Sequence, residues 1–372
     1  MPAEVPALDG VLSAHEVRAT ARTIVAAQEP SGAIPWVSGG HSDVWNHVEA
    51  AMALLAAGEV AAAERAYAWV PTVQRDDGSV PLKVVGSTVD DASGETNMSA
   101  YLAVGVWHHW LLRRDHAFVR RMWPTVRRGL DFVVSMQMPW GGIAWSQEWH
   151  DGAPATVNEE ALLAASSSIH HALRAGLALA ELLDQPQPEW ELAGGRLAHA
   201  VRDHEDLFLD KAHFSMDWYY PVLGGVLTGP AAQRRLAERW DTFVEPGLGI
   251  RCVSRNPWVT GAETCELVLA LEAAGEREGA RRLLSDMQHL RRDDGSYWTG
   301  YVFPDRAHWP DEQTTFTAAA VILAVDALSL TTPGAGIMRA AAMGPSWAPE
   351  LPEIGLECGC ASVDGLERSR VT

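Results

Sequence analysis

Apolar residues recur at helical spacing along most of the chain, and short turns rich in glycine and aromatic residues interrupt them. Val48, Met52 and Leu55 fall on one helical face, and Leu267 and Leu271 do so further along. Six such turns cover residues 28–36, 74–80, 137–145, 210–218, 246–251 and 292–298. A unit that recurs every 40 to 65 residues, roughly, indicates repeated helical pairs, each of which buries its apolar face against its neighbours.

A segment that we predict to be helical follows each turn, over residues 43–57, 95–112, 159–183, 222–240, 263–274 and 313–329. Partner helices are predicted between these segments, for example over 61–73, 119–136 and 278–290. Both sets are rich in alanine, leucine, arginine and glutamate, which favour helices. Short β-like runs are confined to the turns. Six helical hairpins that close on themselves predict an all-α fold, the (α/α)6 toroid.

The repeat fills residues 1–330, which we predict to form a single domain because a ring of six hairpins needs about this much chain. Beyond Ser329 the sequence contains glycine, proline and small residues but no periodicity. Residues 331–372 are therefore predicted to be a loosely ordered C-terminal extension.

Charge and cysteine content exclude several classes of partner. The chain has 29 basic and 48 acidic residues, a net charge of −19, which argues against nucleic acid, anionic membranes and polyanionic sugars. No signal peptide or membrane span is evident, so we expect a cytoplasmic protein. The four cysteines do not form a disulfide framework, and the single pair Cys358 and Cys360 is not a zinc site. We expect no metal and no cofactor.

The starts of the six inner helices gather around one mouth in such a ring, because these helices all point the same way. Five of the starts are acidic, and Asp43, Glu95, Asp217 and Glu263 stand at four of them. Each acid has an ordinary alternative role, because an aspartate or glutamate at a helix start caps backbone N–H groups. Five acidic starts around one mouth exceed what capping requires and suggest acid/base chemistry there.

Aromatic and polar residues surround these starts and are our candidates for binding substrate. Many of the sixteen tryptophans lie at or beside turns, where an exposed ring can stack on a flat ligand or stabilise a carbocation. The candidate substrate-binding residues are Trp36, His41, Trp45, Asn46, Glu95, Asn97, His170, Asp217, Trp218, Tyr219, Trp258, Glu266 and Trp298. A satisfied core histidine is the alternative for His170.

The turns of the type Gln-x-x-Asp-Gly-Ser resemble the repeats of squalene cyclases and protein prenyltransferases. A cyclase of that class needs an Asp-x-Asp-Asp motif, however, and the nearest match, residues 88–91, lacks the leading aspartate. The prenyltransferase zinc ligands are matched only by Glu263 and Cys265 with His289 or His308, where glutamate replaces aspartate. An isoprenoid enzyme stays open as an alternative, as does a glycan-binding toroid without activity.

The six-hairpin glycosidases share this toroid and carry catalytic carboxylates at the inner-helix starts. More narrowly, residues 42–52, 168–174, 216–225 and 256–261 resemble an actinobacterial family often labelled prenyltransferase. That family includes the methylmannose polysaccharide hydrolases, which are endo-acting α-mannanases, and the resemblance covers about residues 10–328. It implies hydrolysis of internal α-1,4-mannosidic bonds in a neutral, partly methylated polysaccharide.

Glycoside hydrolysis needs one protonated carboxyl group and one carboxylate. We expect Asp43 and Glu263 to be this catalytic pair, drawn from the first and fifth hairpins. That placement suits a carboxyl separation of about 6.5–9.5 Å and therefore an inverting mechanism. The less polar surroundings of Glu263 make it the expected acid and Asp43 the expected base.

Overall fold

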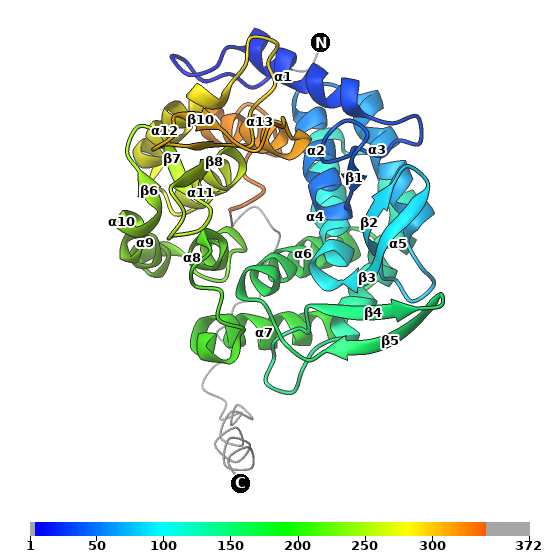
Figure 1. Cartoon of the computed structure of the whole chain (residues 1–372). Coiled ribbons are helices and arrows are strands. Elements are labelled where there is room, and N and C mark those ends of the chain that lie inside the picture. The colour runs from blue at the N-terminus through cyan, green and yellow to red at the C-terminus, as the bar shows by residue number, and fades with distance from the viewer. Residues whose placement is uncertain (1–3, 340–372) are drawn as a thin grey trace.

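The computed structural model describes residues 4–339 and is a closed ring of helices (Figure 1). Six inner helices in this part of the chain each contact the next, and the last, α13, returns to contact α2. They are α2 (Val44–Ala56), α4 (Thr96–Arg113), α6 (Leu163–Leu182), α8 (Ser215–Leu223), α11 (Gly261–Ala273) and α13 (Thr315–Ser329). The predicted (α/α)6 toroid is therefore confirmed.

An outer layer of helices packs against this inner ring. It consists of α1 (Ala14–Ala27), α3 (Val60–Val73), α5 (His116–Ser135), α7 (Pro188–Asp203), α9 (Gly229–Glu238) and α12 (Arg277–Asp286), with the short helices α10 (Trp240–Phe243), η1 (Glu205–Leu207) and η2 (Met287–Leu290). Inner helices are buried on nearly all sides, and residues 315–328 of α13 are all buried. Outer helices are amphipathic, and α12 buries only Ala280, Leu283 and Leu284.

One predicted helix is misplaced. We expected an inner helix over residues 222–240, but the chain there forms the end of α8 and then the outer helix α9. The helix starts earlier, at Ser215, and accommodates Pro221 inside it, whereas the sequence around this proline suggests a turn. Gly225, with a φ of 72°, follows the end of α8, which explains why the helix is short.

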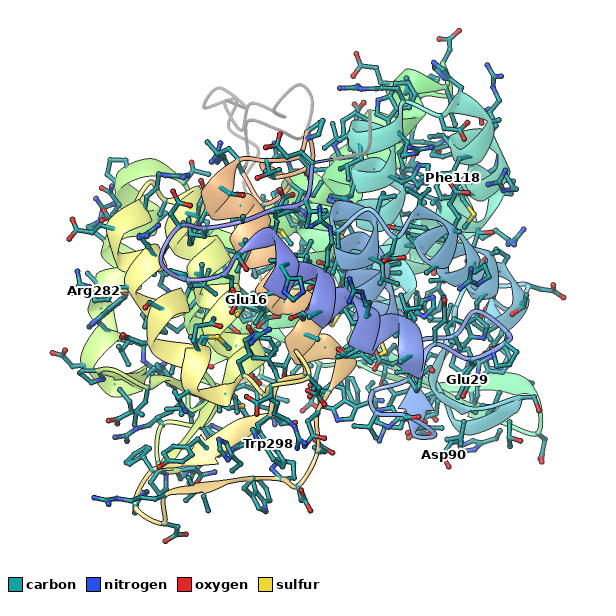
Figure 2. The ribbon with its side chains drawn as sticks, turned by 90° about the horizontal axis from the view of Figure 1, so that it is seen from above. Glu16, Glu29, Asp90, Phe118, Arg282 and Trp298 are labelled. Carbon is teal, nitrogen blue, oxygen red and sulfur yellow. The ribbon has the colours of Figure 1, made fainter. Side chains whose placement is uncertain are left out.

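The turns contain ten short strands in residues 4–339, arranged as two antiparallel five-stranded sheets. The first sheet contains β1 (His41–Ser42), β2 (Pro81–Val85), β3 (Thr88–Glu95), β4 (Ser146–His150) and β5 (Ala153–Asn158). The second contains β6 (Val244–Glu245), β7 (Gly249–Arg251), β8 (Trp258–Thr260), β9 (Gly300–Val302) and β10 (Ala307–His308). Asp90 and Trp298, one from each side, lie at the same end of the ring (Figure 2). The sheets thus surround the mouth.

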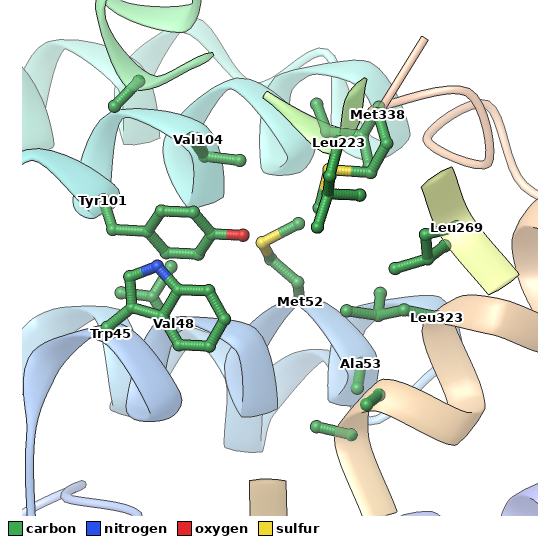
Figure 3. Packing of buried hydrophobic residues seen from close by; sticks show 14 of the residues in the cluster. Trp45, Val48, Met52, Ala53, Tyr101, Val104, Leu223, Leu269, Leu323 and Met338 are labelled. Carbon is green, nitrogen blue, oxygen red and sulfur yellow. The ribbon is translucent and has the colours of Figure 1, made fainter. Parts of the chain in front are cut away.

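The chain beyond α13 packs into the ring as far as it is described. Ile337 and Met338 are buried, and Met338 lies beside Leu223 of the inner helix α8 (Figure 3). Asp326 of α13 accepts hydrogen bonds from the backbone and hydroxyl of Thr332 (2.9 and 2.5 Å). The packed region therefore extends past the expected boundary at residue 330 to residue 339. The rest of the predicted extension lies outside the described residues.

None of the helices in residues 4–339 combines the length and apolarity that crossing a membrane requires.

The contact between α6 and α8 gives a test of this packing. A Cβ atom added to Gly224 would lie 2.1 Å from the backbone oxygen of Ser167, so the two helices would have to separate. We expect Gly224→Ala to lower the free energy of unfolding by about 1–3 kcal/mol, measured by urea unfolding. Gly279→Ala is the matched control, because that position on α12 has open space and alanine favours helix. Equal stability of the two variants would contradict this packing.

Candidate active site

Four of the predicted acidic residues stand at inner-helix starts. Asp43 is the N-cap of α2 and Glu95 is the N-cap of α4, while Asp217 and Glu263 lie in the first turns of α8 and α11. Strand β1 leads into α2, β3 ends at Glu95, and β8 leads into α11. The two sheets therefore hold these helix starts at one end of the ring.

Asp43 is buried, with 4% of its surface exposed. One carboxylate oxygen accepts the backbone N–H of Asn46 at 2.8 Å, and the other accepts the side-chain amide of Asn46 at 2.6 Å. Burial raises the pKa of Asp43, although the two bonds from Asn46 oppose the shift. Asp43 thus caps a helix and is at the same time a buried carboxyl group whose charged form is less favourable than in water.

Glu95 lies close enough to Asp43 for their charges to interact. Its carboxylate accepts the backbone N–H of Met98 at 2.6 Å, which caps α4. Burial raises the pKa of Glu95 to about 7, and the charge of Asp43 contributes to the shift. The starts of α2 and α4 therefore bring two carboxyl groups together, and these groups do not ionise independently.

Glu263 is half-buried, in the first turn of α11. The Cys252 thiol is its neighbour, and burial, the charge of Glu263 and a hydrogen bond to it raise the pKa of that thiol. The carboxyl group of Glu263 is therefore more accessible than those of Asp43 and Glu95. The acidic groups at the mouth therefore differ in burial. Such differences in surroundings allow one carboxyl group to act as the acid and another as the base.

Below Glu263, one helical turn further along α11, lies a layer of buried acids and tyrosines. Glu266 accepts hydrogen bonds from the hydroxyls of Tyr219 and Tyr220, the second at 2.6 Å. Burial, and after it the charge of Glu263, raises the pKa of Glu266 well above its ordinary value. The charge of Glu266 also helps to raise the pKa of Tyr101 on α4, although α4 and α11 are not neighbours in the ring. The layer therefore spans the lumen of the ring.

Glu49 of α2 belongs to the same layer, and we did not predict it. Its Oε1 accepts the Tyr101 hydroxyl at 2.5 Å, its Oε2 has no partner among the described residues, and only 2% of its surface is exposed. The sequence does contain a signal, since Glu49 is a lone charge between Val48 and Ala50 in an apolar helix.

The predicted aromatic residues fall into three groups. Trp36 is stacked on His41 and donates its indole N–H to Glu312 at 3.1 Å, near the start of α13. Trp45 is buried against Tyr101, with a centroid distance of 4.7 Å, and donates to Ser168 across the ring. Trp36 therefore lies beside the start of α13, and Trp45 lies against the acid–tyrosine layer.

The second group lies on the second sheet. The indole N–H of Trp258 donates to the backbone oxygen of Trp309 at 2.8 Å. Trp298 is stacked on His308 at a centroid distance of 5.0 Å, and the guanidinium of Arg292 lies over its ring. Both predicted tryptophans are half-buried at the mouth.

The third group faces the outer helices. Trp218 is fully buried, stacks on Phe243 and donates to the backbone oxygen of Arg235 on α9. A tryptophan in that position stabilises the packing of α8 on the outer layer, so we leave it out of the proposed site. Tyr219, by contrast, belongs to the acid–tyrosine layer, as described above.

Three predicted polar residues remain. The Nδ1–H of His170 donates to the backbone oxygen of Gly224 (2.8 Å), and burial lowers the pKa of His170 to about 4. Asp217 accepts the backbone N–H of Ala164, and burial raises its pKa to about 6. Both therefore join α6 to α8. Asn97, beside Glu95, keeps a buried side-chain oxygen without a partner among the described residues.

No group of three or more His, Cys, Asp or Glu side chains in the described part of the chain is arranged to hold a metal ion.

The acid–tyrosine layer predicts a specific pH dependence of stability. Burial raises the pKa of Glu49 to about 7 from an ordinary value of 4.5. Because the folded protein then binds the proton more tightly than the unfolded chain, the free energy of unfolding falls as the pH rises through this window. Glu49→Gln cannot ionise, so it should lose less stability, by up to about 3 kcal/mol.

Urea unfolding at about pH 5 and about pH 8 measures this difference. Glu189→Gln, at an exposed position on α7, is the matched control and should follow the wild type. A Glu49→Gln protein that loses as much stability as the wild type would refute the assignment.

Comparison with known proteins identifies the family. No family model matches the chain. An MMP endo-(1,4)-3-O-methyl-alpha-D-mannosidase of Mycolicibacterium hassiacum is 52% identical over 358 residues, which are 96% of this chain and 97% of the relative. Among solved structures, a wild-type glycosidase has a TM-score of 0.67 at 16% identity and covers 86% of this chain and 97% of its own.

Two further solved structures show how widely this fold is used. A GH63 mannosylglycerate hydrolase from Thermus thermophilus in complex with glucose has a TM-score of 0.59 at 15% identity and covers 83% of this chain and 99% of its own. A D-mannose isomerase has a TM-score of 0.62 at 12% identity, with 87% and 99% covered. At these identities the likeness concerns the fold alone. The relative that is 52% identical over nearly the whole chain decides the family: this protein belongs to the family of that endo-mannosidase and is a glycoside hydrolase.

Proposed function

We propose that this protein hydrolyses internal α-1,4-mannosidic bonds of a 3-O-methylated mannose polysaccharide. The observation that carries the proposal is the 52% identity, over 96% of the chain, to a relative named for that activity. Half-buried tryptophans at the mouth support it, because methyl ethers and the C–H faces of sugars are apolar. Membership of a hydrolase family sets aside the isoprenoid and purely glycan-binding alternatives. The cytoplasmic location remains a prediction.

We propose Asp43 and Glu263 as the catalytic pair, as the sequence suggested, but with their roles exchanged. The acid must hold a proton before reaction, and burial of Asp43 makes its charged form less favourable than it is in water. The base must reach a water molecule, and Glu263 is the more accessible of the two. Glu95 lies beside Asp43, and repulsion between the two carboxylates disfavours the state in which both are ionised.

The proposed reaction is a single displacement. Asp43 donates its proton to the glycosidic oxygen as the bond from that oxygen to the anomeric carbon breaks. Glu263 removes a proton from water, and the water oxygen attacks the anomeric carbon from the opposite face. The α-linked sugar is released as the β anomer. The proton lost by Asp43 is restored from solvent, and the one held by Glu263 is released.

Substitution of either acid tests the pair. We expect Asp43→Asn and Glu263→Gln to lower kcat on 3-O-methylated α-1,4-mannan by about 10²-fold to 10⁴-fold, because each removes a proton-transfer group. Products are quantified by mass spectrometry. Asp115→Asn is the matched control: Asp115 also caps a helix, with its carboxylate on the backbone of Ala117 and Phe118, but it does so on the outer helix α5.

If Asp43→Asn and Asp115→Asn had equally small effects, Asp43 would be only a capping residue. A wild-type protein that left methylated and unmethylated α-1,4-mannans intact would overturn the proposed function as a whole.

A substrate with a better leaving group distinguishes the acid from the base. An aryl glycoside of a methylated mannan oligosaccharide leaves as a stabilised phenolate and needs little help from an acid. We expect Asp43→Asn to recover at least about tenfold of its lost activity on this substrate, and Glu263→Gln to recover none, because the water still needs a base. Initial rates measured by absorbance decide this, and the opposite pattern would restore the roles expected from the sequence.

A further inference from the structure

Trp309 is the most exposed large hydrophobic side chain in residues 4–339, with 56% of its surface accessible. It lies directly after β10, at the mouth end of the ring, and is not among the residues that we predicted to bind substrate. A single exposed aromatic side chain is common on protein surfaces, so its exposure alone does not indicate a ligand. Trp309 is distinguished by its place at the mouth, where its ring contacts Trp258.

The ring is held in a fixed orientation. It contacts Trp258 edge to face, with a centroid distance of 5.0 Å and an angle of 77° between the planes. The backbone oxygen of Trp309 accepts the indole N–H of Trp258 at 2.8 Å, and its backbone N–H donates to Gly300 at 3.0 Å. A ligand that stacks on Trp309 thus loses little free energy to ordering the protein.

The same contacts place Trp309 beside the proposed catalytic site. Trp258 lies two residues before Thr260, the N-cap of α11, which at about 3.3 Å per strand residue is roughly 7 Å away. Glu263 lies in the first turn of that helix. On the other side, Glu312 accepts the indole N–H of Trp36, which stacks on His41 just before Asp43.

Residues 309–312 therefore lie beside the start of α13, which is the inner helix between α11 and α2. Trp298 belongs to the same sheet region and lies at the mouth end in Figure 2. The chain from Trp309 to Glu312 thus lies between the helix starts that carry Glu263 and Asp43.

We propose that Trp309, supported by Trp258, is a distal subsite that stacks on methylated sugar units of the polysaccharide beyond the bond that is cut. The inference rests on the proposed function. Cleavage inside a chain requires sugar units on both sides of the scissile bond, so part of the glycan must lie outside the ring. An aromatic face binds the apolar face of a sugar, and an O-methyl group extends that apolar surface.

The test compares Trp309→Ala and Trp309→Phe on a long and a short 3-O-methylated α-1,4-mannan oligosaccharide. The ratio of kcat/KM on the long substrate to kcat/KM on the short one should fall roughly five- to tenfold for Trp309→Ala. Trp309→Phe should retain most of the ratio, because it keeps an aromatic face. Leu192→Ala on α7, where 54% of the leucine surface is exposed, is the matched control and should leave the ratio unchanged.

Binding of the long oligosaccharide is measured by calorimetry alongside hydrolysis, so the two claims fail separately. Weaker binding to Trp309→Ala than to wild type supports the subsite even if the wild-type protein cleaves neither substrate, which would overturn the proposed function instead. An unchanged ratio together with unchanged binding overturns the subsite. So does an equal fall in kcat/KM on both substrates, or a fall in the ratio that Leu192→Ala shares.

Discussion

Closure of the ring by α13 against α2 is the constraint on which the rest of the structure depends. The inner helices carry apolar residues on several sides, and each helix is covered only if the ring is complete. Closure also fixes where chemistry can occur. The segments that enter the inner helices meet at one end, where two small sheets connect them. Asp43, Glu95 and Glu263 lie there because they stand at helix starts.

The same closure explains why so many acidic groups share a raised pKa. Side chains that point into the ring are removed from water, so ionisation costs free energy unless hydrogen bonds or opposite charges compensate. Along α11, steps of three residues lead from Glu263 at the mouth, through Glu266 between its tyrosines, to Leu269 in the apolar floor (Figure 3). Acid/base chemistry on a substrate is therefore confined to the acidic groups at the mouth.

The sequence predicted the ring from its rhythm of helices and glycine-rich turns, because that rhythm is a property of local backbone and of burial. It also predicted which acids stand at helix starts. It failed where local signals conflict with packing: Pro221 and the glycines after it concealed α8, and Ile337 and Met338 pack into the ring without any periodicity. Glu49 was missed because its partner, Tyr101, is distant in sequence, and Trp218 was misjudged because only tertiary structure shows which way its ring points.

Direct displacement by water inside a methylated α-1,4-mannan would determine the configuration of the new reducing ends. Proton NMR of the anomeric region, recorded from the first minutes of a reaction with 3-O-methylated α-1,4-mannan, measures that configuration. New internal reducing ends are expected to appear first as the β anomer and then to equilibrate. Initial formation of the α anomer, or release of single sugars from one end, would overturn the proposed endo-acting, inverting hydrolysis.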